Sequence, residues 1–261
     1  MTMKRALVTG GGQRLGRAMA LYLAQRGCDV AVHFNTSQGP AAQVVDQIRT
    51  MGRQAVALNA DLLDEAAVQR LLPRAAQALG GPVQVLVNNA SIFERDTLQS
   101  ATRTSWDRHM ESNLRAPFVL IQALAAQAPA AQSDENGEPL AQALAINMID
   151  QRVRKLTPDF MSYTLAKMGL WALTRTAAQA LAPHVRVNAI GPGPTLQGAC
   201  QSNEQFARQR RATLLHRGAE AGDITAALGY FLEAPAITGQ LLCVDGGQHL
   251  AWETPDVTDV E

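Results

Sequence analysis

The chain has 261 residues, enough for one α/β domain or two small ones, and 47% of them are hydrophobic, so it can bury a sizeable core. Lys plus Arg and Asp plus Glu both total 23, and this balance argues against binding nucleic acid or a membrane surface through bulk charge. No uncharged stretch approaches the roughly 20 residues of a membrane helix, and the apolar run near the start is too short for a signal peptide.

The first predicted unit is a strand, a glycine-rich turn and a helix. Residues 6–8 form a short apolar strand, the glycine-rich segment 9–16 follows, and helical spacing covers 14–25. Glycines permit a tight turn and close backbone approach, while a helix N-terminus attracts phosphate. A glycine run alone could be a surface turn, but the flanking strand and helix are the context that a dinucleotide site requires.

The second predicted strand, residues 29–35, bears on the choice of cofactor. In NAD-selective sites an acid near the end of this strand binds the ribose 2′-hydroxyl, but Asp29 lies at the strand's beginning. Polar residues follow the strand instead and a cation lies in the glycine turn: His33, Asn35, Thr36, Ser37 and Arg14. Donors and a cation suit a 2′-phosphate, so we expect NADPH, although these residues could simply cap a loop.

The middle of the chain alternates helices and strands. We expect helices over 43–51 and 65–79, strands over 54–60 and 83–87, and a long helical region over 104–127 that contains Asn113. Pro73 predicts a kink or an early stop in the second of these helices. Residues 128–140 are expected to form a surface loop with a turn at Asn136-Gly137.

A buried strand over 143–148 leads to the chemistry-bearing residues. Asp150 follows this strand, and Tyr163 and Lys167 stand four apart, so on a helix they share one face. An ammonium beside a phenol favours the phenolate, so we expect Lys167 to lower the pKa of Tyr163 and to make it a proton donor or acceptor near neutrality. Such a pair also occurs by chance, and the dinucleotide motif upstream is what makes it persuasive.

The remaining elements complete the predicted fold. A strand over 184–190 ends at Gly191-Pro192, residues 196–217 are expected to form a mobile lid, and a helix over 223–232 precedes a strand over 240–244. Strands that alternate with helices imply a single-domain α/β Rossmann fold, with a seven-stranded parallel sheet covered by helices on both faces. We expect one NADP-binding domain over 1–250 and a C-terminal tail over 251–261.

These motifs, in this order and over essentially the whole chain, resemble the short-chain dehydrogenase/reductase family. The resemblance rests on 9–16, Asn59-Ala60-Asp61-Leu62, Asn88-Asn89-Ala90, Asn113, Tyr163 with Lys167, and 187–193. It implies that Asp61 contacts the adenine, that Asn113 bends its helix to hold a relay water, and that Lys167 holds the nicotinamide ribose. It further implies that the cofactor is bound by Gly10, Gln13, Arg14, Leu15, Gly16, His33, Asn35, Thr36, Ser37, Asp61, Leu62, Asn89, Ala90, Ser91, Tyr163, Lys167, Pro192, Gly193 and Thr195.

One departure from the family pattern concerns the catalytic serine. Family members carry a serine some dozen residues before the tyrosine, but no serine lies between Ser133 and Ser162 here, and Asp150 stands in that place. An ionised carboxylate only accepts hydrogen bonds and would repel the oxyanion that forms on a carbonyl. A substrate with N–H donors or a ring nitrogen to be protonated would suit it, unless Asp150 is merely an exposed loop acid.

Arg14, Ser91, Phe93 and Asp150 together resemble the pteridine reductase branch of the family. The resemblance implies an NADPH-dependent reductase of dihydromonapterin, dihydrobiopterin or dihydrofolate, with the pterin stacked on Phe93 and a catalytic set of Asp150, Tyr163, Lys167 and Asn113. The implied substrate contacts are Arg14, Ser91, Phe93, Asp150, Tyr163 and Leu196. Phe93 as an ordinary core aromatic is an open alternative.

Two other functions stay open: a generic NADPH carbonyl reductase of the 3-oxoacyl carrier-protein kind, and a nucleotide-sensing regulator. We expect no metal site, because the cysteines at 28, 200 and 243 lack metal spacing, and we expect structural roles for the histidines at 109, 184, 216 and 249, which have no partners at metal or triad spacing. Reduced thiols predict a cytoplasmic protein. Asp245-Gly246-Gly247 resembles the family's last strand end, which implies a homotetramer with no nucleic-acid or membrane partner.

Overall fold

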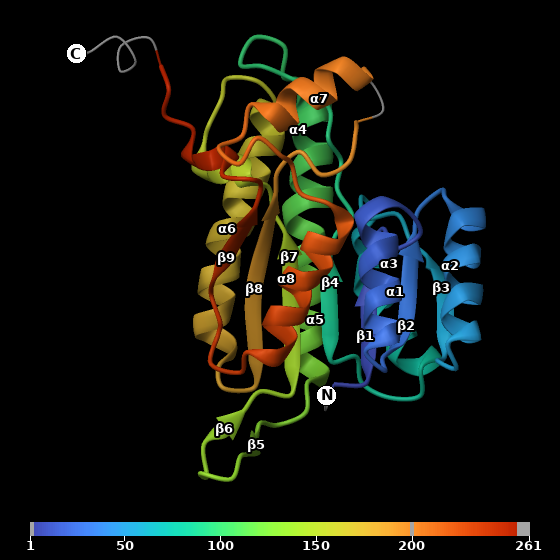
Figure 1. Cartoon of the computed structure of the whole chain (residues 1–261). Helices are drawn as coiled ribbons and strands as arrows, with labels where there is room; N and C mark the ends of the chain where they lie inside the picture. The colour runs from blue at the N-terminus through green and yellow to red at the C-terminus, as the bar shows by residue number, and fades with distance from the viewer. Residues whose placement is uncertain (1–2, 199–200, 255–261) are drawn as a thin grey trace.

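A seven-stranded parallel sheet runs through the centre of the protein (Figure 1). The computed structural model describes residues 3–198 and 201–254. The strand order is β3-β2-β1-β4-β7-β8-β9, which confirms the predicted Rossmann-type α/β fold. The strands are β1 (Arg5–Val8), β2 (Asp29–Phe34), β3 (Ala55–Asn59), β4 (Val85–Asn88), β7 (Ala143–Met148), β8 (Val185–Pro192) and β9 (Leu241–Val244).

Helices cover both faces of the sheet, as predicted. Figure 1 shows α1 and α8 in front of the sheet and α5 behind it. One face carries α1 (Arg14–Gln25), α2 (Gln38–Thr50) and α8 (Ala221–Glu233), and the other carries α3 (Glu65–Ala78), α5 (Ala116–Gln127) and α6 (Met161–Leu181). At the carboxyl end of the sheet lie α4 (Arg103–Met110), α7 (Asn203–Arg211) and the single turns η2 (Gln151–Arg154) and η3 (Gln248–Leu250).

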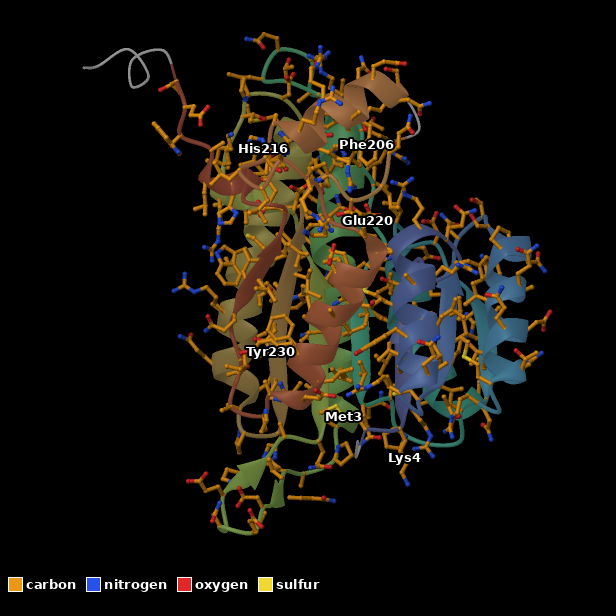
Figure 2. The ribbon with its side chains drawn as sticks, in the orientation of Figure 1. Met3, Lys4, Phe206, His216, Glu220 and Tyr230 are labelled. Carbon is orange, nitrogen blue, oxygen red and sulfur yellow. The ribbon has the colours of Figure 1, made fainter. Side chains whose placement is uncertain are left out.

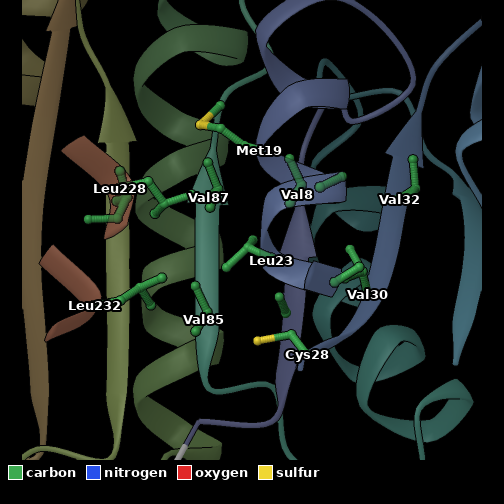
Figure 3. Close-up of a cluster of buried hydrophobic side chains, with 14 of the residues drawn as sticks. Val8, Met19, Leu23, Cys28, Val30, Val32, Val85, Val87, Leu228 and Leu232 are labelled. Carbon is green, nitrogen blue, oxygen red and sulfur yellow. The ribbon is translucent and has the colours of Figure 1, made fainter. Parts of the chain in front are cut away.

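The core forms because apolar residues recur on one side of each helix that covers the sheet and along both sides of the central strands. Figure 3 shows Met19 and Leu23 of α1 facing Val87 and Val85 of β4, with Leu228 of α8 beside them. These side chains belong to one buried cluster and are essentially inaccessible to solvent. Burying a side chain of this size contributes roughly 1.5–3 kcal/mol, so this packing holds α1 and α8 against the strands of the sheet.

The sheet reverses its order of strands between β1 and β4. From β1 the chain moves outward to β2 and β3, and it then returns to add β4, β7, β8 and β9 on the other side. Loops that leave the carboxyl ends of two such neighbouring strands diverge and leave a crevice, which is where ligands bind in sheets of this kind. Figure 2 shows that Met3 and Lys4 lie at the opposite end of the sheet from Phe206 of α7.

Two element boundaries, one loop and the effect of one proline differ from the sequence predictions. The helix predicted over 43–51 begins earlier, at Gln38, and β8 continues through Gly191 to Pro192 because its edge pairs in register with β9. The predicted loop over 128–140 is a small antiparallel ribbon of β5 (Gln132–Ser133) and β6 (Pro139–Leu140), with its turn at Gly137. Pro73 neither stops α3 nor splits it, since neighbouring Leu71, Leu72 and Ala75 are buried against the core.

The long helical region predicted over 104–127 is continuous but not uniform. Between α4 and α5 the backbone forms one π-helical turn, η1 (Glu111–Arg115). Asn113 lies inside this turn and is fully buried. A π-turn inside an α-helix redirects side chains and frequently marks a functional position. The π-turn at Asn113 fits the bend that the family resemblance implies, and the role of Asn113 toward a relay water stays a prediction.

Several expectations concern parts of the chain or properties beyond these elements. No helix among residues 3–198 and 201–254 is long and apolar enough to cross a membrane. Cys28 and Cys243 are free thiols, whereas Cys200 lies outside the described residues. The predicted tail begins at Ala251, and its residues 255–261 also lie outside them.

Candidate active site

A cleft of about 650 Å³ opens at the carboxyl ends of β1, β2, β3, β4, β7 and β8. This volume lies within the range of pockets that hold small molecules and cofactors. Every residue predicted to contact cofactor or substrate lines the cleft except Thr36 and Ser37, and the predicted catalytic residue Asn113 also lies outside the lining. Residues from six separate strand ends therefore meet at one site.

The glycine turn brings the start of α1 close to β1 and β4. A Cβ on Gly16 would lie 2.1 Å from the Gly10 carbonyl oxygen, so only glycine fits there. The side chain of Asn89 donates to the carbonyl oxygens of Thr9 and Gly10 and fastens the turn to the end of β4. The turn can therefore approach a ligand through its backbone.

The N-terminus of α1 is open to an anion. Gln13 at the N-cap makes no side-chain capping bond, and the first turn contains no acidic residue. The first N–H groups of a helix lack partners within the helix and carry partial positive charge, so they bind phosphate groups well. Together with the cleft volume, this uncapped terminus fits the pyrophosphate of a dinucleotide.

Among the residues predicted to meet a 2′-phosphate, Arg14 and Asn35 line the cleft, while His33 is already engaged. The Nδ1 atom of His33 accepts from the Gly10 N–H at 3.0 Å, and Nε2 lies 3.0 Å from the Ala60 carbonyl oxygen. Burial lowers the pKa of His33, so the ring is neutral. His33 thus shapes the glycine turn and leaves no free N–H for a ligand.

Arg14 connects the two sides of the cleft. Its backbone has a positive φ of 51°, and its guanidinium donates to the carbonyl oxygens of Gln197 and Leu196 at 2.8 and 3.0 Å. Arg14 is exposed, so its cation faces the cleft and the segment after Thr195 at once. Thr36 and Ser37 instead form the approach to α2, with Ser37 at its N-cap.

Other predicted cofactor residues lie along the same cleft. Asp61 accepts from the Leu63 N–H at 3.0 Å and from Asn35 at 3.4 Å, which holds its carboxylate beside the end of β2. Thr195 is buried, with its hydroxyl donating to the Gly193 carbonyl oxygen at 3.1 Å. These contacts fix both ends of the site where adenine and nicotinamide are expected.

Asp150, Tyr163 and Lys167 meet at the inner end of the cleft. The Tyr163 hydroxyl donates to Asp150 Oδ2 at 3.0 Å. Asp150 Oδ1 accepts from the backbone N–H of Arg152 at 2.8 Å, which caps the turn η2 and holds the carboxylate in place. Lys167 Nζ donates to the Met148 carbonyl oxygen at 2.8 Å. The loop after β7 therefore aims Asp150 at Tyr163.

The prediction that Lys167 lowers the pKa of Tyr163 is wrong for this arrangement. Burial and the negative charge of Asp150 raise the pKa of Tyr163 well above its ordinary value. Burial lowers the pKa of Lys167 to about 8, and burial raises the pKa of Asp150. Asp150, rather than Lys167, is the charged group that bonds to the phenol, and it favours the protonated form.

Phe93 lies in the cleft and is not a core aromatic, since 54% of its surface is exposed. Its ring stacks on Phe160 at 4.3 Å between centroids and meets the Tyr163 ring edge-on at 4.7 Å. Phe160 is outside the cleft lining, so it supports Phe93 from behind. Phe160 itself has a left-handed backbone, with φ 57°, directly before α6.

Asn113 lies outside the cleft lining and holds Ile92, which lines the cleft. Its Oδ1 accepts from the Ile92 N–H at 2.9 Å, and its Nδ2 donates to the Ile92 carbonyl oxygen at 2.8 Å. Both functions of the amide are therefore used to hold the residue before Phe93. The relay water expected from the family resemblance stays a prediction.

The sequence interpretation missed a buried group beside Tyr163. His109 is fully buried, and its Nδ1 lies 2.6 Å from Ser162 Oγ, while Ser162 also bonds to Asp96. The sequence predicted a structural histidine without partners at metal or triad spacing, and it could not identify these partners because they are far away in sequence. The one sequence signal was the spacing of four between His109 and Asn113, which puts them on the same helical face.

The segment predicted as a lid contains α7 and is held by Arg210. Its guanidinium donates to the carbonyl oxygens of Pro194 and Ala219 and pairs with Glu220. Leu196 lines the cleft. Mobility of 196–217 stays a prediction. Among the residues that the structure describes, no three His, Cys, Asp or Glu side chains form a group that could hold a metal ion.

Comparison with known proteins identifies similar chains over the full length. A structure of FolM alternative dihydrofolate reductase 1 from Brucella suis, in complex with NADP, is 42% identical with a TM-score of 0.91, covering 98% of this chain and 99% of that one. The protein of the same name from Brucella canis, complexed with NADP, is 41% identical with a TM-score of 0.89, covering 99% of each chain.

A more general relative is also similar. The 3-oxoacyl-acyl-carrier-protein reductase FabG of Staphylococcus epidermidis is 30% identical, covering 95% of this chain and 99% of its own. The profile described as short chain dehydrogenase matches residues 4–207. The predicted family, and its similarity to the pteridine reductase branch, are confirmed. On its fold, its Tyr163–Lys167 pair and these matches, the chain belongs to the short-chain dehydrogenase/reductase family.

Proposed function

We propose that this NADP(H)-dependent oxidoreductase reduces a dihydropterin at a ring C=N bond, with dihydromonapterin, dihydrobiopterin and dihydrofolate as the candidate substrates. The observation that carries the proposal is the hydrogen bond from Tyr163 to Asp150, where most of the family has a serine. The two similar Brucella proteins, called alternative dihydrofolate reductases, support the substrate class.

NADPH is the proposed cofactor, in the cleft between the glycine turn and β4. The uncapped start of α1 would take the pyrophosphate, and Arg14 with Asn35 would take the 2′-phosphate. His33 would contribute by fixing Gly10 rather than by direct contact. NADP is bound in both Brucella structures, which supports this choice.

The reaction adds a hydride to the carbon and a proton to the nitrogen of the C=N bond, and NADPH supplies the hydride when bound. Tyr163 would deliver the proton from its Oη to the ring nitrogen. Its raised pKa keeps that proton on the phenol at neutral pH until the substrate is bound. Asp150, whose pKa is raised as well, would take up a proton from water in the cleft and pass it to the Tyr163 phenolate across the hydrogen bond that joins them.

The substrate would lie on the exposed face of Phe93 with its edge toward Asp150. A planar ring gains from stacking on an aromatic side chain, and Phe160 supports Phe93 from the other side. The carboxylate of Asp150 accepts hydrogen bonds, so it matches the N–H groups of a pterin. Arg14, Ser91 and Leu196 line the same part of the cleft and would complete the contacts.

The second candidate function is reduction of a 3-oxoacyl carrier-protein substrate, which the similarity to FabG favours. That reaction requires Asp150 to be protonated or to turn away, since its charge would oppose the oxyanion. Asp150 is directed at Tyr163, which argues against the turned-away form, while its raised pKa is compatible with the protonated one.

A substrate panel tests the proposal directly. NADPH oxidation is followed with dihydrobiopterin, dihydromonapterin, dihydrofolate and acetoacetyl-CoA under identical conditions. We expect kcat/KM for at least one pterin to exceed that for acetoacetyl-CoA by about 100-fold, since an unpaired buried carboxylate disfavours the wrong substrate by about 3 kcal/mol. Turnover of acetoacetyl-CoA alone would reject the pterin proposal in favour of the carbonyl reductase. NADPH binding without any turnover would indicate the regulator.

The substitution Phe93→Leu tests the stacking surface. We expect KM for the pterin to rise about tenfold with kcat nearly unchanged, because an aromatic contact contributes about 0.5–1.5 kcal/mol beyond its buried area. Steady-state kinetics at saturating NADPH measure both constants. Phe118→Leu on α5, a partly exposed phenylalanine, is the matched control and should leave KM unchanged. An unchanged KM in Phe93→Leu would show that the substrate lies elsewhere.

Assembly, location and boundaries belong to the same proposal. We propose a homotetramer, on the resemblance of Asp245-Gly246-Gly247 to the family's subunit-contact strand, and a cytoplasmic location. We also propose that residues 1–250 form the NADP-binding domain and 251–261 the tail. Light scattering of the purified protein measures the assembly directly.

A further inference from the structure

The backbone around Phe93 is held from both sides by two side chains of one helical face. Asn113 bonds to both backbone groups of Ile92, directly before Phe93. His109, four residues earlier, accepts through Nε2 from the Glu94 N–H at 3.2 Å, directly after Phe93. Side chains four apart on a helix lie one above the other, so together they fix the position of Phe93.

His109 also connects this segment to the helix that carries Tyr163. Because Nε2 accepts from Glu94, the ring proton must be on Nδ1, which then donates to Ser162 Oγ at 2.6 Å. The Ser162 hydroxyl in turn donates to Asp96, and the Ser162 N–H donates to the same carboxylate at 3.1 Å. The donors therefore follow one order: the Glu94 N–H donates to His109, His109 donates to Ser162, and Ser162 donates to Asp96.

The hydrogen-bonded residues His109, Ser162 and Asp96 are buried, and Asp96 carries their negative charge. His109 is fully buried, Asp96 is 4% exposed, and the His109 ring lies 6.1 Å from the Tyr163 ring in an edge-on arrangement. Burial alone would raise the pKa of Asp96, but hydrogen bonds from Ser162 and Ser105 outweigh it and hold that pKa below its usual range. Asp96 is thus the anion that ends the chain.

We propose that His109 is a positioning residue that sets the distance between Phe93 and Tyr163. Its two ring nitrogens bond to the residue after Phe93 and to the residue before Tyr163, so one rigid ring joins both sides of the substrate site. His109 does not line the cleft, so it acts on the substrate only through these neighbours. The inference rests on the proposed function, which puts the substrate between these two rings.

The role requires a neutral His109. A second ring proton would be placed on Nε2, where it would face the Glu94 N–H, a donor against a donor. The charged groups around the ring are Asp96 and Glu94, which favour protonation, and Arg108, which opposes it; burial outweighs them and lowers the pKa of His109 from its ordinary 6.5. The arrangement is therefore intact at neutral pH and fails only on acidification below about 6.5.

Two substitutions separate the two bonds. His109→Asn retains a donor near the Nδ1 position for Ser162 but cannot reach Glu94, whereas His109→Gln extends an acceptor to the Nε2 position. We expect His109→Asn to raise KM of the substrate about tenfold, the effect of one hydrogen bond of about 1.4 kcal/mol, with kcat and NADPH Kd held within about threefold. His109→Gln should recover most of the loss in KM.

A matched control comes from the opposite end of the sheet. His184 Nδ1 accepts from the Ala131 N–H at 3.0 Å, so His184→Asn breaks the same kind of bond away from the cleft and should leave KM unchanged. An unchanged KM in His109→Asn overturns the proposal. So does a fall of kcat and of the thermal midpoint, together with a rise of KM, that His109→Gln fails to rescue, since that pattern is a loss of structure alone.

The pH profile gives an independent readout, which decides the matter if His109→Asn does not fold. Wild-type KM should climb as pH falls below about 6.5, and His109→Gln, which has no ring to protonate, should lack that climb, whereas protonation of Asp150, whose pKa is raised, affects both enzymes alike. Identical profiles overturn the proposal. The assay uses whichever substrate the wild type turns over; if that is acetoacetyl-CoA rather than a pterin, the proposed function fails while the KM comparison still tests His109.

Discussion

Tyr163→Phe is expected to reduce kcat by at least about 100-fold with every substrate, while the Kd of NADPH changes by less than about threefold. The substitution removes only the phenolic oxygen, so the ring keeps its edge-on contact with Phe93. The proton that Tyr163 supplies to the substrate is lost, and water has little access to replace it because Tyr163 is 5% exposed. Turnover and fluorescence titration with NADPH measure the two constants.

The control for this variant is Tyr230→Phe on α8. Tyr230 is 52% exposed and lies on the helix packed against α1, away from the cleft, so its loss of a hydroxyl should leave kcat unchanged. Thermal unfolding of both variants checks that the fold persists. A Tyr163→Phe enzyme with wild-type turnover would show that another group supplies the proton, and the mechanism would have to be abandoned.

Asp150→Ser is expected to shift the substrate preference from pterins toward acetoacetyl-CoA. Pterin turnover should fall about 100-fold, because the carboxylate that accepts from pterin N–H groups is gone and those groups are left unpaired. Reduction of acetoacetyl-CoA should rise, because a serine hydroxyl donates to the carbonyl and no longer opposes the oxyanion. The ratio of kcat/KM for the two substrates is the measurement, and an unchanged ratio would deny Asp150 any part in specificity.

Asp150→Asn is the matched variant, since it keeps the size of the side chain and removes the charge. Pterin turnover should fall here too. The variant also tests the raised pKa: an acid whose pKa is higher in the folded state stabilises the fold as pH falls through that pKa, so its charge destabilises the fold at higher pH. The free energy of unfolding of Asp150→Asn should therefore exceed that of the wild type at pH 8, and the difference should shrink on acidification. A constant difference would contradict the raised pKa.

The order of strands and helices could be predicted because it follows from local periodicity. The helix over Arg14–Gln25 and the strand over Ala143–Met148 have the predicted bounds, since apolar residues repeat on one face of the first and fill the second. The start of α2 was predicted too late. Its first turn is Gln38, Gly39 and Pro40, which carry no apolar pattern, and the helix begins there because Ala41 packs into the core.

The candidate site, too, could be predicted only in part from the sequence. Residue types and spacing were enough to select Asp150, Tyr163 and Lys167, but the direction of the Tyr163 pKa was predicted wrongly. Lys167 is four residues from Tyr163 on the same helical face, yet its ammonium bonds to Met148, and the hydroxyl bonds to Asp150 from another loop. A pKa depends on burial and on the nearest charge, and neither is contained in sequence spacing.

His109 makes the division clear. The sequence by itself determined the family, the dinucleotide motif and the catalytic residue types, because each is a pattern of neighbouring residues that local backbone geometry converts into structure. Only the tertiary structure decided that His33 accepts from the Gly10 N–H and that Phe93 stacks on Phe160. It also decided that His109 joins Glu94 to Ser162. Those contacts join residues 15 to 67 positions apart, and they arise where loops from separate strands converge at one end of the sheet.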